Sequence, residues 1–231
     1  MIPQSLRALL DRAHVRWRDP VLTGLTVLMA LHLFVVAPLG AIHRIDLRPV
    51  SIIVAIVLAA ALLILSRSIV PAAGVLGAFV LFGVALLLRS HRGDSTLDIC
   101  FEATAWLMVS FVIIWVVSRA VFAAGRITYH RVIGAVLLYL TIGVVFVALF
   151  TLVAAFDPGS INGLTAVDRV FVPSDFIYFS FITLTTVGYG DIVPVHPFAR
   201  SLCNVEAIIG QLYPATLLAR LVSLEIGSRA D

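Results

Sequence analysis

Six long apolar runs constrain the fold of this chain more than any other feature of its sequence. Hydrophobic residues make up 61% of its 231 positions and charged residues only 13%, which is too apolar for a soluble domain of this size. An α-helix rises about 1.5 Å per residue, so runs of this length cross most of a hydrocarbon layer about 30 Å thick. We therefore predict an all-α membrane protein with six transmembrane helices, at residues 21–39, 50–65, 70–88, 99–117, 132–156 and 198–226. For the first run, a cleaved signal peptide is the alternative, although the run is long for one.

The distribution of arginine predicts the orientation of these helices. The chain has no lysine, and its net charge is +3. With six spans both termini lie on one side, and ten arginines fall on that side against six on the other. Because basic residues favour the cytoplasmic side, we expect a multi-pass protein of the cell membrane with cytoplasmic N- and C-termini. No basic run indicates a nucleic-acid partner. No constellation of reactive side chains indicates an enzyme or an organic cofactor.

A polar, glycine-containing run interrupts the apolar pattern before the last span. Residues 185–191 read Thr-Thr-Val-Gly-Tyr-Gly-Asp, and we expect a short helix at 174–184 to lead into them, with Ser174 as its N-cap. Gly188 and Gly190 lack a Cβ and so permit left-handed backbone. Irregular backbone at membrane depth is tolerated only where it lines a cavity or is buried in protein. An ordinary glycine-rich turn between two helices is the alternative interpretation.

The five residues Thr186, Val187, Gly188, Tyr189 and Gly190 resemble the selectivity filter of the tetrameric potassium channel family, whose filters carry Thr-Val-Gly-Tyr-Gly. Thr185 and Asp191 extend the match. The resemblance implies that backbone carbonyls of Thr186, Val187, Gly188 and Tyr189, with the Thr186 hydroxyl, replace the hydration shell of K⁺. Since the chain carries one filter and the ion site needs four, it also implies a homotetramer.

The resemblance divides the chain into regions. It covers residues 132–226 and implies a re-entrant pore helix and filter loop inside a pore domain. The expected regions are a cytosolic segment at 1–20, a four-helix transmembrane region at 21–118, a linker at 119–131 and a pore domain at 132–231. Within the pore domain we expect an outer helix at 132–156, a pore helix at 174–184, a filter at 185–191 and an inner helix at 198–226.

Four residues are expected to support the filter: Thr185, Asp191, Tyr178 and Glu206. Tyr178 is placed to hydrogen-bond Asp191 and hold the outer end of the filter; simple aromatic packing is the alternative. Some relatives carry a glutamate in the pore helix against this aspartate, but here that position is Ile182, so no paired-carboxylate gate is predicted. Glu206 is a charge at mid-membrane depth, so it should face protein, behind the filter and hydrogen-bonded to groups of the pore helix.

The inner helix carries a predicted hinge. Gly210 lies twenty residues after Gly190, where related channels have a hinge glycine, and Pro214 removes the hydrogen bond to the Gly210 carbonyl. A static kink is the alternative. Gln211, at a spacing that places it on one face with Pro214 and Leu218, is expected to line the cavity with Leu218.

The fourth apolar run lacks the repeated arginines of a voltage sensor. Residues 99–117 contain Glu102 and no arginine, while Arg119 and Arg126 lie at or beyond the end of the run. We therefore expect a potassium-selective channel that conducts K⁺ passively and is not voltage-gated. A pore subunit of a potassium transport complex, gated by a partner, is the alternative, and a membrane enzyme or scaffold with a fortuitous motif is a third. His196, beside the outer mouth, is either a pH sensor or an inert surface residue.

Overall fold

A computed structural model describes residues 20–43, 50, 53–54, 56–58, 60–61, 69–92, 96–122, 129–167 and 170–230. Five helices in these residues are long and apolar enough to cross a membrane: Pro20–Gly40, Pro71–Leu88, Thr96–Arg119, Tyr129–Phe156 and Pro197–Arg220. The protein is thus an all-α, multi-pass membrane protein. Half of the predicted span at 50–65 falls outside the described residues, and those of its residues that are described are helical. The predicted cytosolic segment lies outside the described residues except for Pro20.

The helices follow one another along the chain with short connections. Residues 20–31 are α-helical and continue into a π-helical stretch, η1 (His32–Val36), and then into α2 (Ala37–His43). The later helices are α4 (Ile69–Arg92), α5 (Thr96–Val121), α6 (Tyr129–Phe156), α7 (Pro173–Leu184) and α8 (Pro197–Ala230). Two short antiparallel strand pairs lie in the chain between α6 and α8: β1 (Ile161–Asn162) with β4 (Val193–Pro194), and β2 (Ala166–Val167) with β3 (Val170–Phe171).

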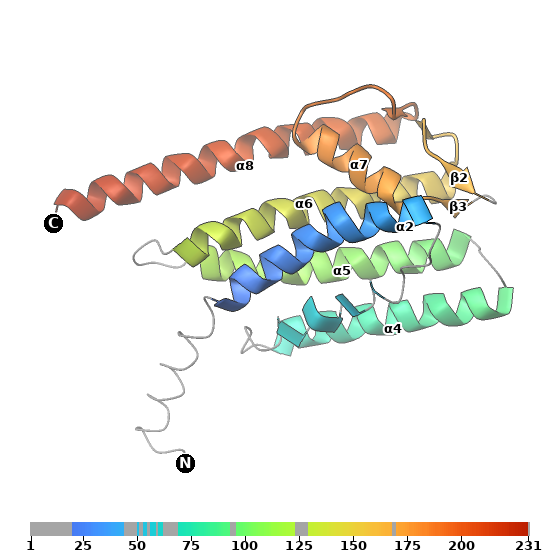
Figure 1. Ribbon diagram of the computed structural model, residues 1–231, viewed down its shortest axis with the longest axis horizontal. Helices are drawn as coiled ribbons and strands as arrows, with labels where there is room; N and C mark the ends of the chain where they lie inside the picture. The colour runs from blue at the N-terminus through green and yellow to red at the C-terminus, as the bar shows by residue number, and fades with distance from the viewer. Residues whose placement is uncertain are drawn as a thin grey trace, which may run out of the picture.

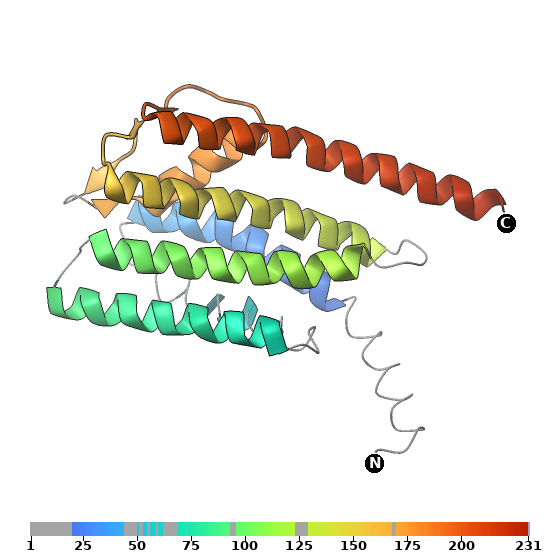
Figure 2. The same cartoon turned by 180° about the vertical axis from the view of Figure 1, so that it is seen from behind.

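The long helices pack side by side in a layered bundle. Seen from behind, α8, α6, α5 and α4 lie one beneath another, with the N-terminal helix beside α6 (Figure 2). One apolar core joins the first span, α4, α5 and the first half of α6, and a second joins the rest of α6 to α7 and the start of α8. The second core holds α7 in place, so the position of α7 depends on both of its long neighbours, α6 and α8.

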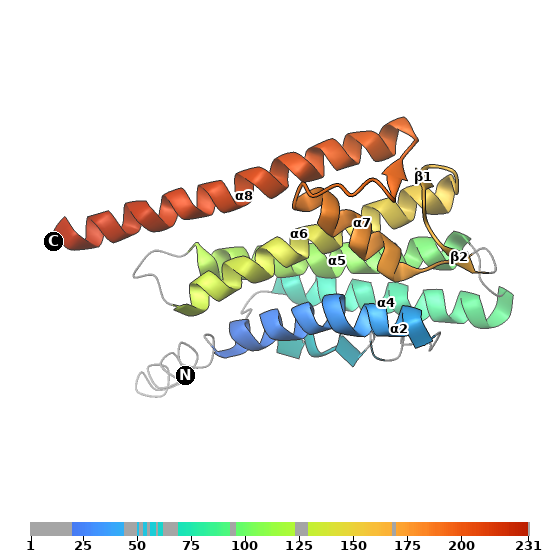
Figure 3. The same cartoon turned by 45° about the horizontal axis from the view of Figure 1, so that its top comes forward.

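The short helix α7 enters the bundle and does not cross it. It has 12 residues against 28 in α6, and the chain after it returns to the end from which α7 started (Figures 1 and 3). A Cβ on Gly143 of α6 would lie 2.7 Å from Cζ of Phe181, so the glycine allows α7 to approach α6 closely. A helix that enters part of the way and an extended return form a re-entrant loop between α6 and α8.

The first span also contacts the pore helix. The ring of Phe34, in η1, meets the ring of Phe181 edge-on at 5.1 Å between centroids. Thr26 Oγ1 donates to the Ile133 carbonyl at 3.2 Å, which joins the same span to α6. The π-helical turn was not predicted, since the run His32–Val36 contains neither glycine nor proline.

The start of α7 differs from its prediction. The N-cap is Val172 and no side chain caps the helix, so the prediction of Ser174 as N-cap is wrong. Pro173 occupies the first turn, where its fixed φ suits a helix start and its missing N–H costs nothing. The Asp175 carboxylate turns back to accept a hydrogen bond from the Thr165 N–H at 2.7 Å.

Candidate functional site

The run of residues 185–191 is anchored to the end of α7 by backbone hydrogen bonds from its first residues. The N–H groups of Val187 and Gly188 both donate to the carbonyl of Ile182, at 2.9 and 3.1 Å, and the N–H of Thr186 donates to Thr183 at 2.9 Å. These bonds turn the chain away from the helix axis and fix where the extended segment begins. The C-terminal end of α7, which carries the negative end of its dipole, therefore lies at the base of this segment.

The backbone of the segment alternates in handedness. Thr186, Gly188 and Gly190 have φ angles of +58°, +54° and +82°. Thr186 is the one described residue other than glycine with a positive φ, a conformation that a β-branched residue adopts only where its surroundings impose it. The alternation explains why glycine is needed at 188 and 190 and not at 187 and 189.

The carbonyl groups of the segment are free of hydrogen bonds. Within the described part of the chain, no donor reaches the carbonyl oxygens of residues 186–190. Residues 185–191 are all exposed, with Val187 at 51% and Tyr189 at 73%. Buried or membrane-depth carbonyls need partners. Carbonyl oxygens left without such partners can serve as ligands for a cation, which needs oxygen donors in place of water.

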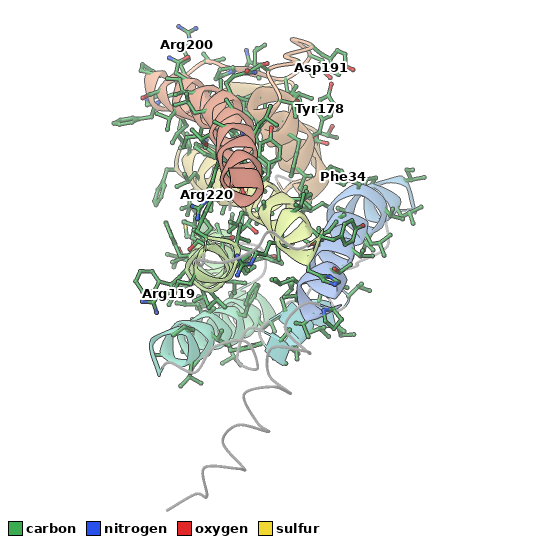
Figure 4. The ribbon with its side chains drawn as sticks, turned by 90° about the vertical axis from the view of Figure 1, so that its left-hand side faces the viewer. Phe34, Arg119, Tyr178, Asp191, Arg200 and Arg220 are labelled. Atoms are coloured by element: carbon green, nitrogen blue, oxygen red, sulfur yellow. The ribbon has the colours of Figure 1, made fainter. Side chains whose placement is uncertain are left out.

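The outer end of the segment is tied by side chains. Tyr178 donates from its hydroxyl to Asp191 Oδ2 at 2.8 Å, which is the hydrogen bond expected from the sequence, and the two residues lie together in Figure 4. The rings of Tyr178 and Tyr189 stack at 6.4 Å between centroids. Beyond Asp191, the N–H groups of Val195 and His196 both donate to the Ser160 carbonyl, at 2.8 and 3.0 Å. His196 accepts from the Phe198 N–H at 3.2 Å, and its role in pH sensing stays a prediction.

The inner end of the segment meets α8. Gln211 contacts Thr186 through Nε2 and Oγ1 at 2.9 Å. The neighbouring Gly210 lies so close to α7 that a Cβ would overlap the Leu184 carbonyl oxygen. Pro214 and Leu218 are exposed on α8, and the helix continues through the proline. A hinge at Gly210 and Pro214 and a cavity lined by Gln211 and Leu218 stay proposals.

A buried polar cluster lies behind the segment. Glu206 of α8 and Ser180 of α7 are both 0% exposed, and their side-chain oxygens Oε1 and Oγ are 2.5 Å apart. Ser180 Oγ also lies 2.9 Å from the carbonyl oxygen of Gly143 in α6. Glu206 was expected to hydrogen-bond to groups of the helix at 174–184, and it contacts Ser180 of that helix; its support of a filter stays a prediction.

Sequence reasoning missed several members of this neighbourhood. Tyr139 places its hydroxyl 3.4 Å from the Leu184 carbonyl, and its ring stacks on Tyr213 at 5.8 Å. Tyr213 in turn donates to the Ala135 carbonyl at 2.8 Å. The available signal was a set of polar atoms, including Ser180, inside otherwise apolar helices, where each must find a partner. Their partners depend on how the helices are rotated, which the sequence does not show.

The arginines at the opposite end of the bundle are held by aromatic rings. The guanidinium of Arg119 lies 4.9 Å from the ring centroid of Trp115, and that of Arg220 lies 4.7 Å from Phe122. Arg220 Nη2 also donates to the Phe122 carbonyl at 3.0 Å, joining the end of α8 to the end of α5. Figure 4 labels both arginines, Arg119 on α5 and Arg220 on α8. In α5, Arg119 is the basic residue of the last turn, and Arg126 lies outside the described residues.

Among the described residues, no three or more His, Cys, Asp or Glu side chains come together in a group that could hold a metal ion. The ligands that the site offers are the backbone oxygens of residues 186–190 and the Thr186 hydroxyl. Uncharged oxygen ligands of this kind suit a hard cation that must enter and leave.

Comparisons with known proteins identify the family of the chain. A family model described as ion channel matches residues 134–225. The chain is 32% identical over 125 residues to "Potassium channel K1" of Plasmodium berghei, covering 54% of this chain and 5% of that protein. It is 32% identical over 123 residues to "Protein LctB" of Bacillus caldotenax, covering 51% of this chain and 88% of the relative. A second "Protein LctB", from Geobacillus stearothermophilus, is 31% identical over 124 residues, or 52% of this chain and 89% of the relative. No solved structure matches the chain significantly. With its pore region matched and a relative covered over most of its length, the chain belongs to the ion channel family, among relatives that include a potassium channel.

Proposed function

We propose that this protein is a potassium-selective channel that conducts K⁺ passively through the segment of residues 186–190. The observation that carries the proposal is the alternating backbone of Thr186, Gly188 and Gly190, with its row of unpaired, exposed carbonyl oxygens. The similarity to a protein described as a potassium channel supports the choice of ion. A K⁺ ion passing the segment exchanges water for these oxygens and for the Thr186 hydroxyl.

One chain supplies a quarter of such a site. The segment is exposed on one side and anchored on the other, and oxygens from a single strand do not surround an ion. Four copies around one axis complete the coordination, and closed cyclic symmetry is the usual arrangement for identical chains. We therefore propose a homotetramer in the cell membrane, with the exposed face of α8 turned toward the axis. This places Gln211 and Leu218 in the inner cavity.

Opening of the channel does not depend on charges in α5. The described residues of this helix place one arginine, Arg119, in its last turn, and steep voltage dependence needs several charges that move through the field. Both termini are proposed to be cytoplasmic, following the arginine bias. The N-terminal helices then serve as a scaffold, since the first span packs on the pore helix through Phe34.

Flux measurements on the purified chain in liposomes test the proposal. We expect K⁺ efflux down its gradient without nucleotide or partner, and little Na⁺ efflux under the same conditions. Equal permeation of K⁺ and Na⁺ would contradict selectivity. Flux that appears only after a partner protein is added would favour the alternative, a pore subunit of a transport complex.

A further inference from the structure

The buried contact among Glu206, Ser180 and Gly143 joins three helices at one point. Ser180 Oγ is 2.5 Å from Glu206 Oε1 and 2.9 Å from the Gly143 carbonyl oxygen. Both Glu206 and Ser180 are fully buried. The three residues belong to α8, α7 and α6, so this cluster links both long pore helices to the short one.

The protonation state of Glu206 follows from the number of protons available for the two contacts of Ser180. A serine hydroxyl has one proton and can donate one hydrogen bond. The Gly143 carbonyl is an acceptor only, and an ionised carboxylate would also be an acceptor only. With Glu206 ionised, one of the two short contacts would bring two acceptors together without a proton. A second proton, on the carboxyl group, satisfies both contacts.

The surroundings of Glu206 also favour a protonated, neutral carboxyl group. Its Oε2 is buried and has no hydrogen-bond partner, which suits the carbonyl oxygen of a neutral acid far better than half of a charged carboxylate. The titratable groups that interact with it are Tyr139 of α6 and Cys203 of α8, and neither is a cation. No described arginine or histidine pairs with Glu206, so nothing in this part of the chain compensates a buried negative charge.

We propose that Glu206 is a neutral carboxylic acid whose O–H donates a hydrogen bond to Ser180 Oγ, while the Ser180 hydroxyl donates a hydrogen bond to the Gly143 carbonyl. We call this chain of two hydrogen bonds the relay, and we propose that it positions the pore helix behind the filter. The relay fixes α7 against α6 and α8 at Ser180, two residues before Ile182, whose carbonyl accepts from Val187 and Gly188. Glu206 is therefore a positioning residue. Its effect on conduction rests on the proposed function, whereas its protonation state does not.

Infrared spectroscopy of the purified protein tests the protonation state directly. In the difference spectrum of wild type minus Glu206→Gln at neutral pH, we expect the C=O stretch of a carboxylic acid. The symmetric and antisymmetric stretches of a carboxylate in its place would overturn the proposal. This signature is independent of whether the protein conducts.

Substitutions test the relay. In Glu206→Gln the side-chain amide still donates to Ser180, so we expect a thermal unfolding midpoint and a K⁺ flux within about twofold of wild type. Glu206→Ala and Ser180→Ala each break the chain of donors, and we expect midpoints lower by about 2–8 °C and loss of most K⁺ selectivity. A Gln variant as impaired as the Ala variant would contradict the relay.

A matched control separates this effect from the removal of a hydroxyl alone. Ser110 of α5 is also buried, at 1% exposure, and its hydroxyl has no partner among the described residues. Ser110→Ala should therefore leave unfolding and flux unchanged. If the infrared band is present and wild-type K⁺ flux is absent, the proposed function fails and the neutral acid stands. If wild-type K⁺ flux is present and the carboxylate bands appear, the neutral acid is ruled out and the proposed function stands.

Discussion

Gly210 of α8 lies directly against the backbone carbonyl of Leu184, the last residue of α7. A Cβ on Gly210 would overlap the carbonyl oxygen and lie 2.8 Å from the carbonyl carbon. Both partners are backbone, so neither can rotate away. The glycine thus has a packing role that its spacing from the filter did not reveal, whether or not it also serves as a hinge.

Substitution Gly210→Ala should therefore separate α8 from α7. Because helix backbone yields little, we expect a loss of about 1–3 kcal/mol in the free energy of unfolding, measured by denaturation of the purified protein in detergent. Gly83→Ala in α4 is the matched control, since a Cβ there meets nothing within 4 Å. In a helix interior that change should be neutral or slightly stabilising. Equal stability of the two variants would show that the close approach is unimportant.

A second prediction concerns the filter glycine Gly188. A Cβ at this position meets nothing within 4 Å in the chain, so Gly188→Ala acts through its φ angle of +54°. Holding an alanine in this conformation costs about 1–2 kcal/mol, and relaxing it turns the neighbouring carbonyl groups. We expect the variant to fold and assemble but to lose selectivity, measured as the ratio of K⁺ to Na⁺ flux. Gly24→Ala, which also meets nothing within 4 Å, should keep that ratio.

The length of the apolar runs predicted most of the helices, but not where each helix starts or how the helices contact one another. The membrane spans could be predicted because each run is long. The start of α7, in contrast, depends on Pro173, which has a fixed φ, and not on a capping side chain of Ser174. The π-helical turn at His32–Val36 has no breaker residue to announce it. The strand pair β1 and β4 joins residues more than thirty positions apart, which no local pattern specifies.

The candidate site was predictable to the extent that local backbone chemistry defines it. Gly188 and Gly190 indicated left-handed positions, and both have them. Glu206 indicated a buried polar contact because a charge at that depth must find a partner. That the partner is Ser180, with Gly143 behind it, depends on the rotation of three helices about their axes, and tertiary packing alone sets that rotation.

A third prediction concerns the tie between Tyr178 and Asp191. Tyr178→Phe removes a hydrogen bond of 2.8 Å at an exposed site while keeping the ring that stacks on Tyr189. Loss of one such bond costs about 0.5–1.5 kcal/mol. We expect K⁺ current to be less stable over time, measured in planar bilayers at constant voltage. Asp191→Asn tests the same bond from the other side, and the double variant should be no worse than either single one. Additive effects would show that the two residues act separately.

A fourth prediction concerns Gln211, whose amide contacts the Thr186 hydroxyl at 2.9 Å. In the proposed function the Thr186 hydroxyl is a ligand for the ion, and we expect the amide of Gln211, which donates to this hydroxyl, to orient it. Gln211→Leu removes the amide at similar size, so we expect single-channel conductance for K⁺ to fall about three- to tenfold, in line with the loss of one hydrogen bond. Leu86→Ala, at an exposed position on α4 outside the proposed pore, is the control and should leave the conductance unchanged. Unchanged conductance in Gln211→Leu would show that Thr186 is oriented without it.

The last prediction concerns voltage. The guanidinium of Arg119 is stacked at 4.9 Å over Trp115, an exposed residue one turn earlier on α5, and both side chains occur where an interfacial belt of aromatic and basic residues is usual. We expect an arginine held in this way to stay in place, and so to carry no charge through the field, when the channel opens. Neutralising Arg119 and Arg126 to glutamine should therefore leave the relation between open probability and voltage unshifted in planar bilayers. Replacing Trp115 with leucine, which frees Arg119 without removing its charge, should also leave it unshifted. A shift of the relation between open probability and voltage in both variants would mean that the end of α5 moves with voltage. The charge of Arg119 and its contact with Trp115 would then both affect the opening of the channel.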